Sequence, residues 1–299
     1  MNRDKEIKVS IVIPTKNGEK SLDKCLAKIF SQETHESFEV ICIDSGSQDK
    51  TLQICQKYPL RLFQIDKDSF NHGLTRNFGI GMAKGEFVIL ISQDVIPHDE
   101  DWIESLIKDI RKDREIAGVY CRQIPPEDAD VLIKRAFSNH LTGRRTRVVS
   151  FIQDKTEYEN FNPGEKHIFC NFDNVSSCIR RDVWEKIPFA ETNFAEDLDW
   201  SKKVLEAGYK IVYEPEIAVV HLHKRSIFSE YKRAYLHHQK LYELFGFQPV
   251  PTIRKAIVYS LAVTLNDINY VLRKEKTPLK KLVLLFKIPL LSFLKVFGQ

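Results

Sequence analysis

The sequence lacks the cysteine patterns by which metal-binding and disulfide-linked proteins are recognised. No two cysteines form a Cys-x-x-Cys pair, and their spacing has no metal-ligand rhythm. One of them falls inside an apolar, strand-like run and two fall on expected helices, which favours reduced, buried thiols. The six cysteines are Cys25, Cys42, Cys55, Cys121, Cys170 and Cys178.

Signals for export and membrane insertion are missing as well. Residues 1–6 contain none of the apolar core of a signal peptide. No window of about 18 residues is both apolar and uncharged, so we predict no transmembrane helix. We expect a cytoplasmic protein, and the inner face of the plasma membrane is the second location that the sequence allows.

A strong net charge is the third absence. The chain of 299 residues carries 45 Lys and Arg against 41 Asp and Glu, and a net charge of only +4 gives no reason to expect nucleic-acid binding. Its 43% hydrophobic and 29% charged residues are an ordinary globular balance, enough for one large domain or one domain plus an appendage. The positive charge is concentrated in residues 224–299.

Short apolar, β-branched runs alternate with helix-like runs along the first third of the chain. This alternation predicts βαβ units, and therefore an α/β fold with a mostly parallel central sheet flanked by helices. The expected strands are residues 8–14, 38–44, 60–65 and 86–94, and the expected helices begin near Ser21, Thr51, Ile80 and Asp101.

Polar residues stand at the carboxyl ends of these expected strands, where parallel sheets bind their ligands. Thr15 and Asn17 follow the first strand, Asp44 ends the second, and Asp94 ends the fourth. Asp44 could accept a hydrogen bond from the N–H of a uracil or thymine ring, although an Asx-turn explains it equally well. Asp94 is placed to hold a divalent cation against the phosphates of a ligand.

Residues 193–200 concentrate three carboxylates, Glu196, Asp197 and Asp199, at the start of a helix-like run that stops at Gly208. The helix dipole favours ionised carboxylates at this end. Such a carboxylate at the edge of a cleft can take a proton from an attacking hydroxyl. A plain acidic N-cap is the alternative explanation.

Two basic features accompany these carboxylates. Arg76 lies one helical turn after His72. An arginine there could clamp a diphosphate, whereas a surface arginine beside a capping histidine is the alternative. His221 and His223 alternate along a late strand and share one face. A neutral imidazole could complete a carboxylate-held cation site, whereas solvent-facing histidines at a strand end are the alternative.

Taken together, these motifs resemble the inverting nucleotide-sugar glycosyltransferases of family 2, which have the GT-A (Rossmann-like) fold. The matching pieces cover about residues 8–225 and are VSIVIPTKN (9–17), DSGSQD (44–49), SQD (92–94), Glu196-Asp197 and His221. The rhamnosyltransferase-like branch of the family is the most similar, in HGLTRN (72–77), SQDVIP (92–97) and AEDLDW (195–200).

The resemblance implies a role for each matching residue. Asp197 would be the catalytic base and Glu196 would shape its setting. Asp94 and His221 would hold a divalent cation, Mg²⁺ or Mn²⁺. Ser92 stands where the family's Asp-x-Asp motif has its first aspartate, which predicts weaker metal affinity and puts a strict metal requirement in doubt. The donor-binding residues implied are Pro14, Thr15, Asn17, Asp44, Arg76, Gln93 and Asp94.

The implied reaction is inverting transfer of a sugar to a hydroxyl of a glycan or lipid-linked acceptor in surface polysaccharide synthesis. The implied donor is a nucleoside-diphosphate sugar, with dTDP-rhamnose and a UDP-sugar as the candidates. A non-catalytic nucleotide-sugar-binding or scaffold protein of this fold predicts a disrupted acidic pair, which is intact here. A nucleotidylyltransferase predicts a Gly-rich basic loop after the first strand, where residues 15–18 read TKNG.

Two domains are expected, a GT-A catalytic domain in residues 1–225 and a C-terminal helical region in residues 226–299. Within the first, the pattern loosens over residues 118–170, which predicts a long mobile region over the sheet edge. Within the second, residues 275–299 are apolar with scattered lysines, and we predict that they lie on an anionic membrane as a peripheral element. A helical hairpin packed on the catalytic domain or on a partner subunit is the alternative.

Overall fold

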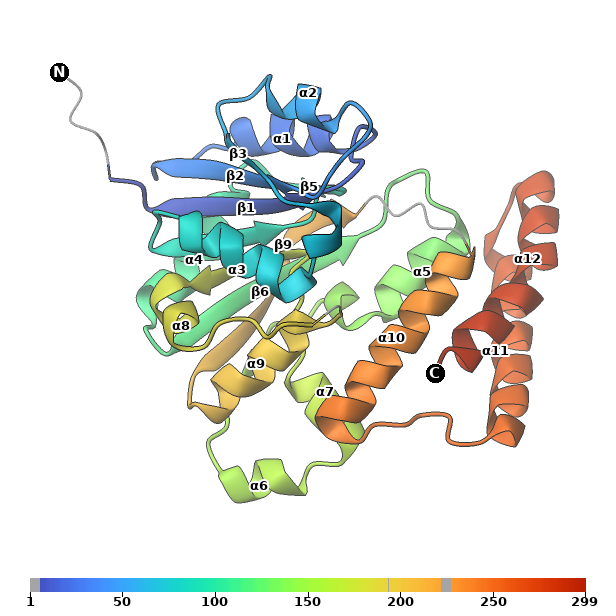
Figure 1. Ribbon diagram of the computed structural model, residues 1–299. Coiled ribbons are helices and arrows are strands. Elements are labelled where there is room, and N and C mark those ends of the chain that lie inside the picture. The colour runs from blue at the N-terminus through green and yellow to red at the C-terminus, as the bar shows by residue number, and fades with distance from the viewer. Residues whose placement is uncertain (1–5, 193, 222–226) are drawn as a thin grey trace. The chain divides into compact units, whose positions relative to one another are not determined.

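The computed structural model describes residues 6–192, 194–221 and 227–299 (Figure 1). Its strands are β1 (Val9–Thr15), β2 (Phe38–Asp44), β3 (Arg61–Gln64), β4 (Phe87–Ile91), β5 (Val95–Pro97), β6 (Ile116–Ile124), β7 (Val148–Ser150), β8 (Ser176–Arg180) and β9 (Lys210–His221). Its helices are α1 (Leu22–Phe30), α2 (Thr51–Cys55), α3 (His72–Met82), α4 (Trp102–Lys112), α5 (Val131–Asn139), α6 (Lys155–Asn160), α7 (Pro163–Phe169), α8 (Arg181–Lys186), α9 (Glu196–Glu206), α10 (Ile227–Phe245), α11 (Ile253–Lys274) and α12 (Pro278–Phe297).

All nine strands join one sheet in the order β3-β2-β1-β4-β8-β6-β9-β5, with β7 paired to β9. The first four of these strands are parallel, as the alternating pattern predicted. Beyond β4 the sheet is mixed, because β8 runs antiparallel to both of its neighbours and β5 and β7 run antiparallel to β9. The expected α/β class with flanking helices is therefore confirmed, and the parallel pairings are those of the N-terminal half together with the pairing of β6 and β9.

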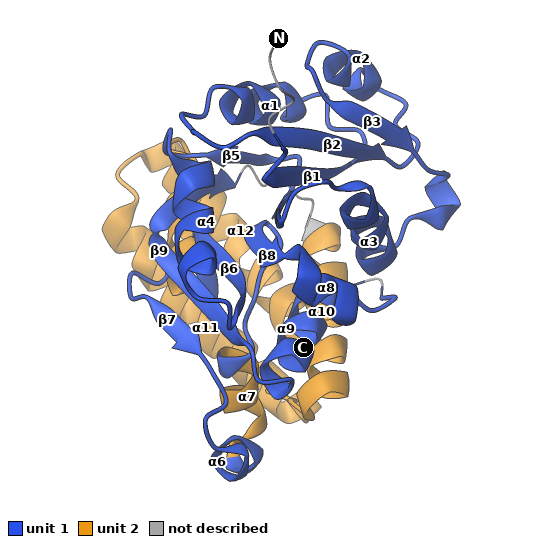
Figure 2. Ribbon diagram, turned by 90° about the vertical axis from the view of Figure 1, so that its left-hand side faces the viewer, with its two compact units in different colours: residues 1–124, 140–160, 169–222 blue, residues 125–139, 161–168, 223–299 orange. Residues whose placement is uncertain are grey.

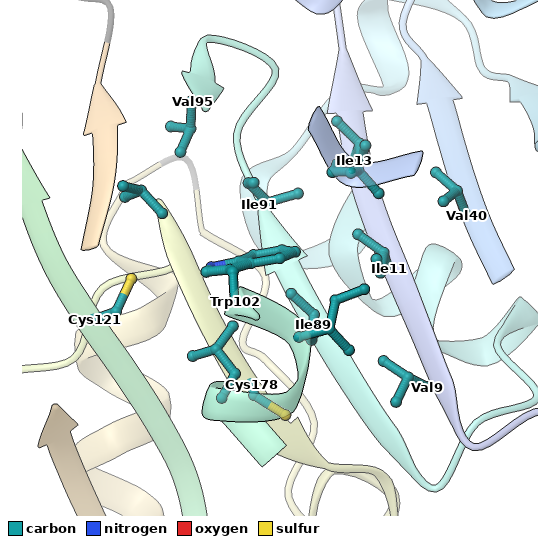
Figure 3. Close-up of a cluster of buried hydrophobic side chains, with 14 of the residues drawn as sticks. Val9, Ile11, Ile13, Val40, Ile89, Ile91, Val95, Trp102, Cys121 and Cys178 are labelled. Atoms are coloured by element: carbon teal, nitrogen blue, oxygen red, sulfur yellow. The ribbon is translucent and has the colours of Figure 1, made fainter. Parts of the chain in front are cut away.

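Apolar side chains fill both faces of the parallel strands. Ile11 and Ile13 of β1 and Ile89 of β4 are fully buried beside Trp102 of α4 (Figure 3). The opposite face receives α3, where Gly79 comes so close that a side chain at this position would collide with Val12 and Ile43. This close approach fixes the position of α3, and with it the residues of its first turn.

Residues 118–170 differ from the expected mobile region. The first seven residues of this stretch and the two before it form β6, which lies inside the sheet between β8 and β9. Gly118, Arg122 and Gln123 interrupt its apolar pattern, and its partner strands come from residues 176–180 and 210–221. No local pattern in the sequence indicates this strand. The prediction of a mobile region over residues 118–170 was wrong for this reason.

The late strands also differ from the expectation. Residues 210–221 form one long strand, β9, where two were expected. Its pairing with β6 shifts register between Cys121 and Arg122, opposite the stretch that contains Pro215. A proline has no N–H for a ladder, and such an irregularity lets the strand continue past it. His223, expected to share a face with His221, lies outside the described residues.

The chain divides into two compact units (Figure 2). The first comprises residues 1–124, 140–160 and 169–222 and holds the whole sheet, and the second comprises residues 125–139, 161–168 and 223–299. The boundary predicted near residue 225 falls outside the described residues. The second unit contains the three long helices expected at the C-terminus, α10, α11 and α12. Of the helices in the described ranges, none is long and apolar enough to cross a membrane.

Candidate functional site

The carboxyl ends of β1 and β2 lie side by side, because Thr15 pairs with Asp44 in the parallel register. The buried Asp44 carboxylate accepts hydrogen bonds from the backbone N–H groups of Gly46 (3.1 Å) and Ser47 (2.9 Å). Its other oxygen accepts from the hydroxyls of Thr15 and Ser47. Asp44 therefore closes an Asx-turn over its own loop, and both of its carboxylate oxygens accept hydrogen bonds there.

The loops after β1, β2 and β4 are tied to one another at this edge. Asn17 has the left-handed φ of 47°, and its side-chain oxygen accepts from the N–H of Gln48 at 2.9 Å. The side-chain amide of Gln93 accepts from the N–H of Lys16 at 3.0 Å and donates to its carbonyl at 2.8 Å. Pro14, half-buried in β1, precedes this loop. The predicted donor residues Pro14, Thr15, Asn17, Asp44 and Gln93 thus share one sheet edge.

The acidic pair begins α9, where the sequence pattern placed it. Glu196 is the first residue of α9 and Asp197 the second, after Ala195 in a left-handed conformation with φ of 54°. A residue with a β-carbon takes this conformation at a cost of about 1–3 kcal/mol, which is common where chemistry is done. Asp199 is in the same first turn, but it forms an ion pair with Lys203 at 2.6 Å.

The start of α3 is bonded to the segment that leads into α9. The side chain of Asn71 accepts hydrogen bonds from the N–H groups of Gly73 and Leu74, and so caps α3. It also accepts from the N–H of Thr192 at 3.2 Å. A side chain at Gly73 would collide with the carbonyl of Ala190. These contacts bring the first turn of α3 next to the acidic pair.

Arg76 of α3 forms a buried ion pair with Glu196, with 2.8 Å between Nη1 and Oε1. The side chains are 9% and 5% exposed, so the guanidinium is held by Glu196 in this structure, and contact of Arg76 with a diphosphate stays a prediction. The same guanidinium nitrogen donates to the carbonyl of His72 at 3.3 Å. Arg76 therefore faces the acidic pair, and its first effect is on the ionisation of Glu196.

Asn174 contacts both carboxylates of the acidic pair. Its backbone N–H donates to Asp197 Oδ2 at 3.1 Å, and its side-chain amide donates to Glu196 Oε1 at 3.1 Å. The other oxygen of Asp197 accepts from the N–H of Leu198 at 2.9 Å. Asn174 itself is buried and bonded to Ser177 Oγ through its side-chain oxygen. The loop before β8 thus fixes the direction of both carboxylates.

The structure also brings Asp94 and His221 together. Residue Val95 pairs with His221 where β5 runs along β9, and Asp94 Oδ1 lies 3.6 Å from His221 Nε2. The Nδ1 atom of this buried imidazole lies 2.8 Å from Gln123 Oε1. Gln123 in turn donates from Nε2 to Asp173 Oδ2 at 2.9 Å. Asp94 itself lies in the turn between β4 and β5, three residues beyond the end of β4.

Residues 173–175 join these two groups. Asp173 ends the chain of contacts that starts at Asp94, and its neighbour Asn174 holds the acidic pair. The carbonyl of Val175 accepts from the N–H of Ser92, at the beginning of the turn that carries Asp94. Three distant parts of the sequence therefore meet at one loop, which we call the 173–175 loop.

The two carboxyls of the acidic pair differ in their affinity for a proton. Burial, the Glu196 charge and the Asp173 charge raise the pKa of Asp197 to about 8. Burial opposes ionisation of Glu196 too, but Arg76, His72 and the Asn174 amide outweigh it and hold the pKa of Glu196 below its ordinary value. Two neighbouring carboxyls with pKa values pushed apart are typical of acid–base chemistry.

The surroundings of Asp94 and His221 fit a divalent cation. Gln123 presents its oxygen to Nδ1, since its amide nitrogen donates to Asp173, so Nδ1 is the donor in this contact and Nε2, which faces Asp94, is the nitrogen left to bind a cation. No cluster of three or more His, Cys, Asp and Glu ligands occurs among the residues that the structure describes. A magnesium-type ion commonly takes one or two protein ligands and completes its shell with phosphate oxygens and water.

Three residues of this site were missed by the sequence analysis: Gln123, Asp173 and Asn174. The Asp-Asn pair precedes β8, whereas Asp44 and Asp94 were noticed at the carboxyl ends of strands. It reaches the same edge of the sheet because β8 runs antiparallel to β4, which the sequence analysis did not anticipate. Gln123 lies within β6 and has no local signal, because its role depends on a strand from much later in the chain.

Comparison of the sequence with known proteins identifies the family to which the chain belongs. A family model described as glycosyl transferase family 2 matches residues 10–175. The chain is 32% identical over 231 residues to the O-antigen chain rhamnosyltransferase RfbN of Salmonella typhimurium, covering 76% of this chain and 70% of that protein. It is 31% identical over 227 residues to the O-antigen chain rhamnosyltransferase WbaN of Salmonella anatum, covering 75% and 69%.

Two solved structures have a similar fold. The mannosyltransferase PcManGT from Pyrobaculum calidifontis, in complex with GDP-Man and Mn²⁺, superposes with a TM-score of 0.62 at 17% identity and covers 99% of this chain and 89% of that chain. S. aureus TarS in complex with UDP-GlcNAc superposes with a TM-score of 0.57 at 18% identity, covering 94% and 71%. The likeness confirms the expected GT-A fold.

Proposed function

Because this chain belongs to glycosyltransferase family 2, we propose that it is an inverting glycosyltransferase of surface polysaccharide synthesis. In this proposal it moves a sugar from a nucleoside-diphosphate sugar to a hydroxyl of a glycan or lipid-linked acceptor. The two O-antigen rhamnosyltransferase relatives favour rhamnose, supplied as dTDP-rhamnose, over a UDP-sugar. Membership of the family favours this function over the nucleotidylyltransferase and the non-catalytic binding protein.

The single observation that carries the proposal is the setting of Asp197. Its carboxylate lies in the first turn of α9, and its Oδ2 atom accepts a hydrogen bond from the backbone N–H of Asn174. A base that works near neutral pH needs a pKa near that pH, and the pKa of Asp197 is about 8. An unperturbed aspartate would be a much weaker proton acceptor.

In the proposed reaction Asp197 takes the proton of the acceptor hydroxyl. The freed oxygen attacks the anomeric carbon from the face opposite the diphosphate. A new C–O bond forms as the bond to the diphosphate oxygen breaks, and the nucleoside diphosphate leaves with that electron pair. The configuration at the anomeric carbon inverts in this single displacement.

Glu196 and Arg76 tune the base in this proposal. The ionised Glu196 raises the pKa of Asp197, and the buried guanidinium of Arg76 keeps Glu196 ionised. Arg76 is thereby a positioning residue for the acidic pair. The donor is assigned to Pro14, Thr15, Asn17, Asp44, Gln93 and Asp94, which lie at the carboxyl ends of β1 and β2 and in the loops after β1 and β4.

Asp94 and His221 would hold a divalent cation, Mg²⁺ or Mn²⁺. Such an ion offsets the negative charge that grows on a departing diphosphate. The chain's own part is to present Asp94 Oδ1 and His221 Nε2 3.6 Å apart and to fix the imidazole through Gln123. The serine at position 92 leaves this pair with one carboxylate.

The proposal is tested by donor binding and by the stereochemistry of the product. Thermal shift with UDP-, dTDP- and GDP-sugars in the presence of Mn²⁺ identifies the donor, with dTDP-rhamnose expected to give the largest rise in Tm. NMR of the product then compares the anomeric configuration with that of the donor. A product that retains the donor's configuration would overturn the inverting mechanism.

A further inference from the structure

Helices α11 and α12 of the second unit expose large apolar side chains to an unusual degree. On α12 these residues recur at intervals of three and four, so they form one stripe along the helix. Their exposed fractions run from 43% to 79%, and the stripe consists of Leu279, Leu282, Val283, Phe286, Leu290 and Phe293. On α11 the same spacing aligns Ile257, Leu261 and Leu265.

The stripe of α12 is not the face by which this helix packs in its unit. Leu284 and Ile288 are buried in a cluster with Val271 of α11, and Val296 is buried too. Gly298, at the end of α12, lies close to Ala234 of α10. Packing within the unit therefore uses one side of α12 and leaves a second, wholly apolar side open.

The same two helices and their connection carry a larger net positive charge than the chain as a whole. Residues 253–299 contain nine Lys and Arg and two acidic residues, whereas the whole chain has a net charge of +4. Both acids are engaged within the unit. Asp267 forms an ion pair with Arg135 at 2.9 Å, and Glu275 accepts from the N–H of Thr277 at 2.8 Å. The charge offered to a partner is accordingly almost all positive.

We propose that α11 and α12 are a docking surface for an anionic phospholipid bilayer. The stripe enters the boundary between headgroups and acyl chains, and exposed lysines such as Lys280 and Lys287 at its margin contact the anionic headgroups. This extends to α11 the peripheral contact expected for residues 275–299. A second copy of the chain suits the surface less well, because it would bring two sets of nine cations together.

The inference does not depend on the proposed function. Binding to a bilayer needs the stripe and the lysines, and it needs neither donor nor catalytic base. Asp197→Asn is therefore expected to bind vesicles as the unchanged chain does. A failure of the proposed transferase activity and a failure of membrane docking can be told apart in this way.

The test is sedimentation of the full chain with vesicles of phosphatidylcholine alone or mixed with phosphatidylglycerol. We expect binding to the anionic vesicles that weakens between 0.1 and 0.5 M NaCl, by roughly fivefold for each lysine that contacts the surface. Phe286→Ser with Leu290→Ser is expected to lower the partition coefficient by about tenfold per residue. Lys280→Gln with Lys287→Gln is expected to lower it for anionic vesicles only.

The matched control is Phe228→Ser, since Phe228 is 75% exposed but lies on α10, outside the stripe. It should leave the partition coefficient unchanged. The proposal is overturned if the full chain does not sediment with anionic vesicles at low salt. It is also overturned if the α12 double variant binds as tightly as the unchanged chain. A third contrary result would be that the unchanged chain is a stable dimer that does not bind vesicles, and that the α12 double variant is a monomer.

Discussion

Arg76 Nη1 lies 2.8 Å from Glu196 Oε1 in an ion pair from which water is almost excluded. Each charge is stable in this setting because the other is present, since an unpaired charge at the same depth would be poorly solvated. This ion pair connects α3 to the first turn of α9. Because α3 packs on β1 and β2, the ion pair fixes Glu196 and Asp197 relative to these strands.

The first prediction concerns this ion pair. Arg76→Met should lower the free energy of unfolding by about 3–5 kcal/mol, because it leaves Glu196 buried without its partner. Adding Glu196→Gln should recover a large part of this loss, since no charge then remains to be paired. Urea unfolding of the two single variants and the double variant measures the coupling. Additive losses would show that the two residues act independently.

The second prediction concerns the pH dependence of activity. If Asp197 is the base, kcat/KM should rise with pH toward an inflection near its pKa of about 8. Glu196→Gln removes a negative charge that raises this pKa, so the inflection should move to lower pH. The measurement is a pH–rate profile of both proteins at saturating metal. If the inflection lay at the same pH in the variant, the charge of Glu196 would have no effect on the pKa of the titrating group.

The third prediction concerns stability. The pKa of Asp197 is higher in the folded protein than in the unfolded chain, so the folded state binds the proton more tightly. Its contribution to stability is therefore full at acid pH and is lost as pH rises toward about 8. Asp197→Asn should raise Tm at pH 9 and leave it nearly unchanged near pH 4, with about 2–4 °C for each kcal/mol. Equal shifts at both pH values would contradict the raised pKa.

The fourth prediction concerns the residues behind His221. Gln123→Leu removes the acceptor that holds Nδ1, and it should weaken Mn²⁺ binding by about 10–100-fold, as losses behind a metal ligand do. Isothermal titration with Mn²⁺ and a nucleoside diphosphate measures the affinity without turnover. Gln53→Leu, on the exposed side of α2, is the matched control. If Gln123→Leu bound Mn²⁺ as tightly as the unchanged chain, His221 would not be a ligand of the cation.

The parts of the fold that the sequence could predict are those with local signals. Strands β1 and β2 are continuous apolar runs that end at polar loops, and α9 follows a dense acidic turn. The class of the fold, the order of its first elements and the three C-terminal helices follow from such patterns. Strand β6 could not be predicted in this way, because Gly118 and Gln123 break its pattern and its partners are distant in the chain.

The candidate site shows the same division. Asp94 and His221 were expected to converge, and the structure places them 3.6 Å apart. The partner of Arg76 was not foreseen, since an ion pair between α3 and α9 depends on the tertiary packing around Gly73 and Gly79. Neither was the 173–175 loop, whose importance comes from the three segments that meet there.

Single-turnover transfer with bound donor measures whether Asp197 removes the proton of the acceptor hydroxyl. The matched comparison is Asp197→Asn against Asp199→Asn, a carboxylate of the same helical turn that pairs with Lys203. We expect the first variant to bind donor normally and to transfer sugar about 10²–10⁴-fold more slowly, while the second stays near the unchanged rate. Near-normal transfer by Asp197→Asn with donor fully bound would show that another group removes the proton.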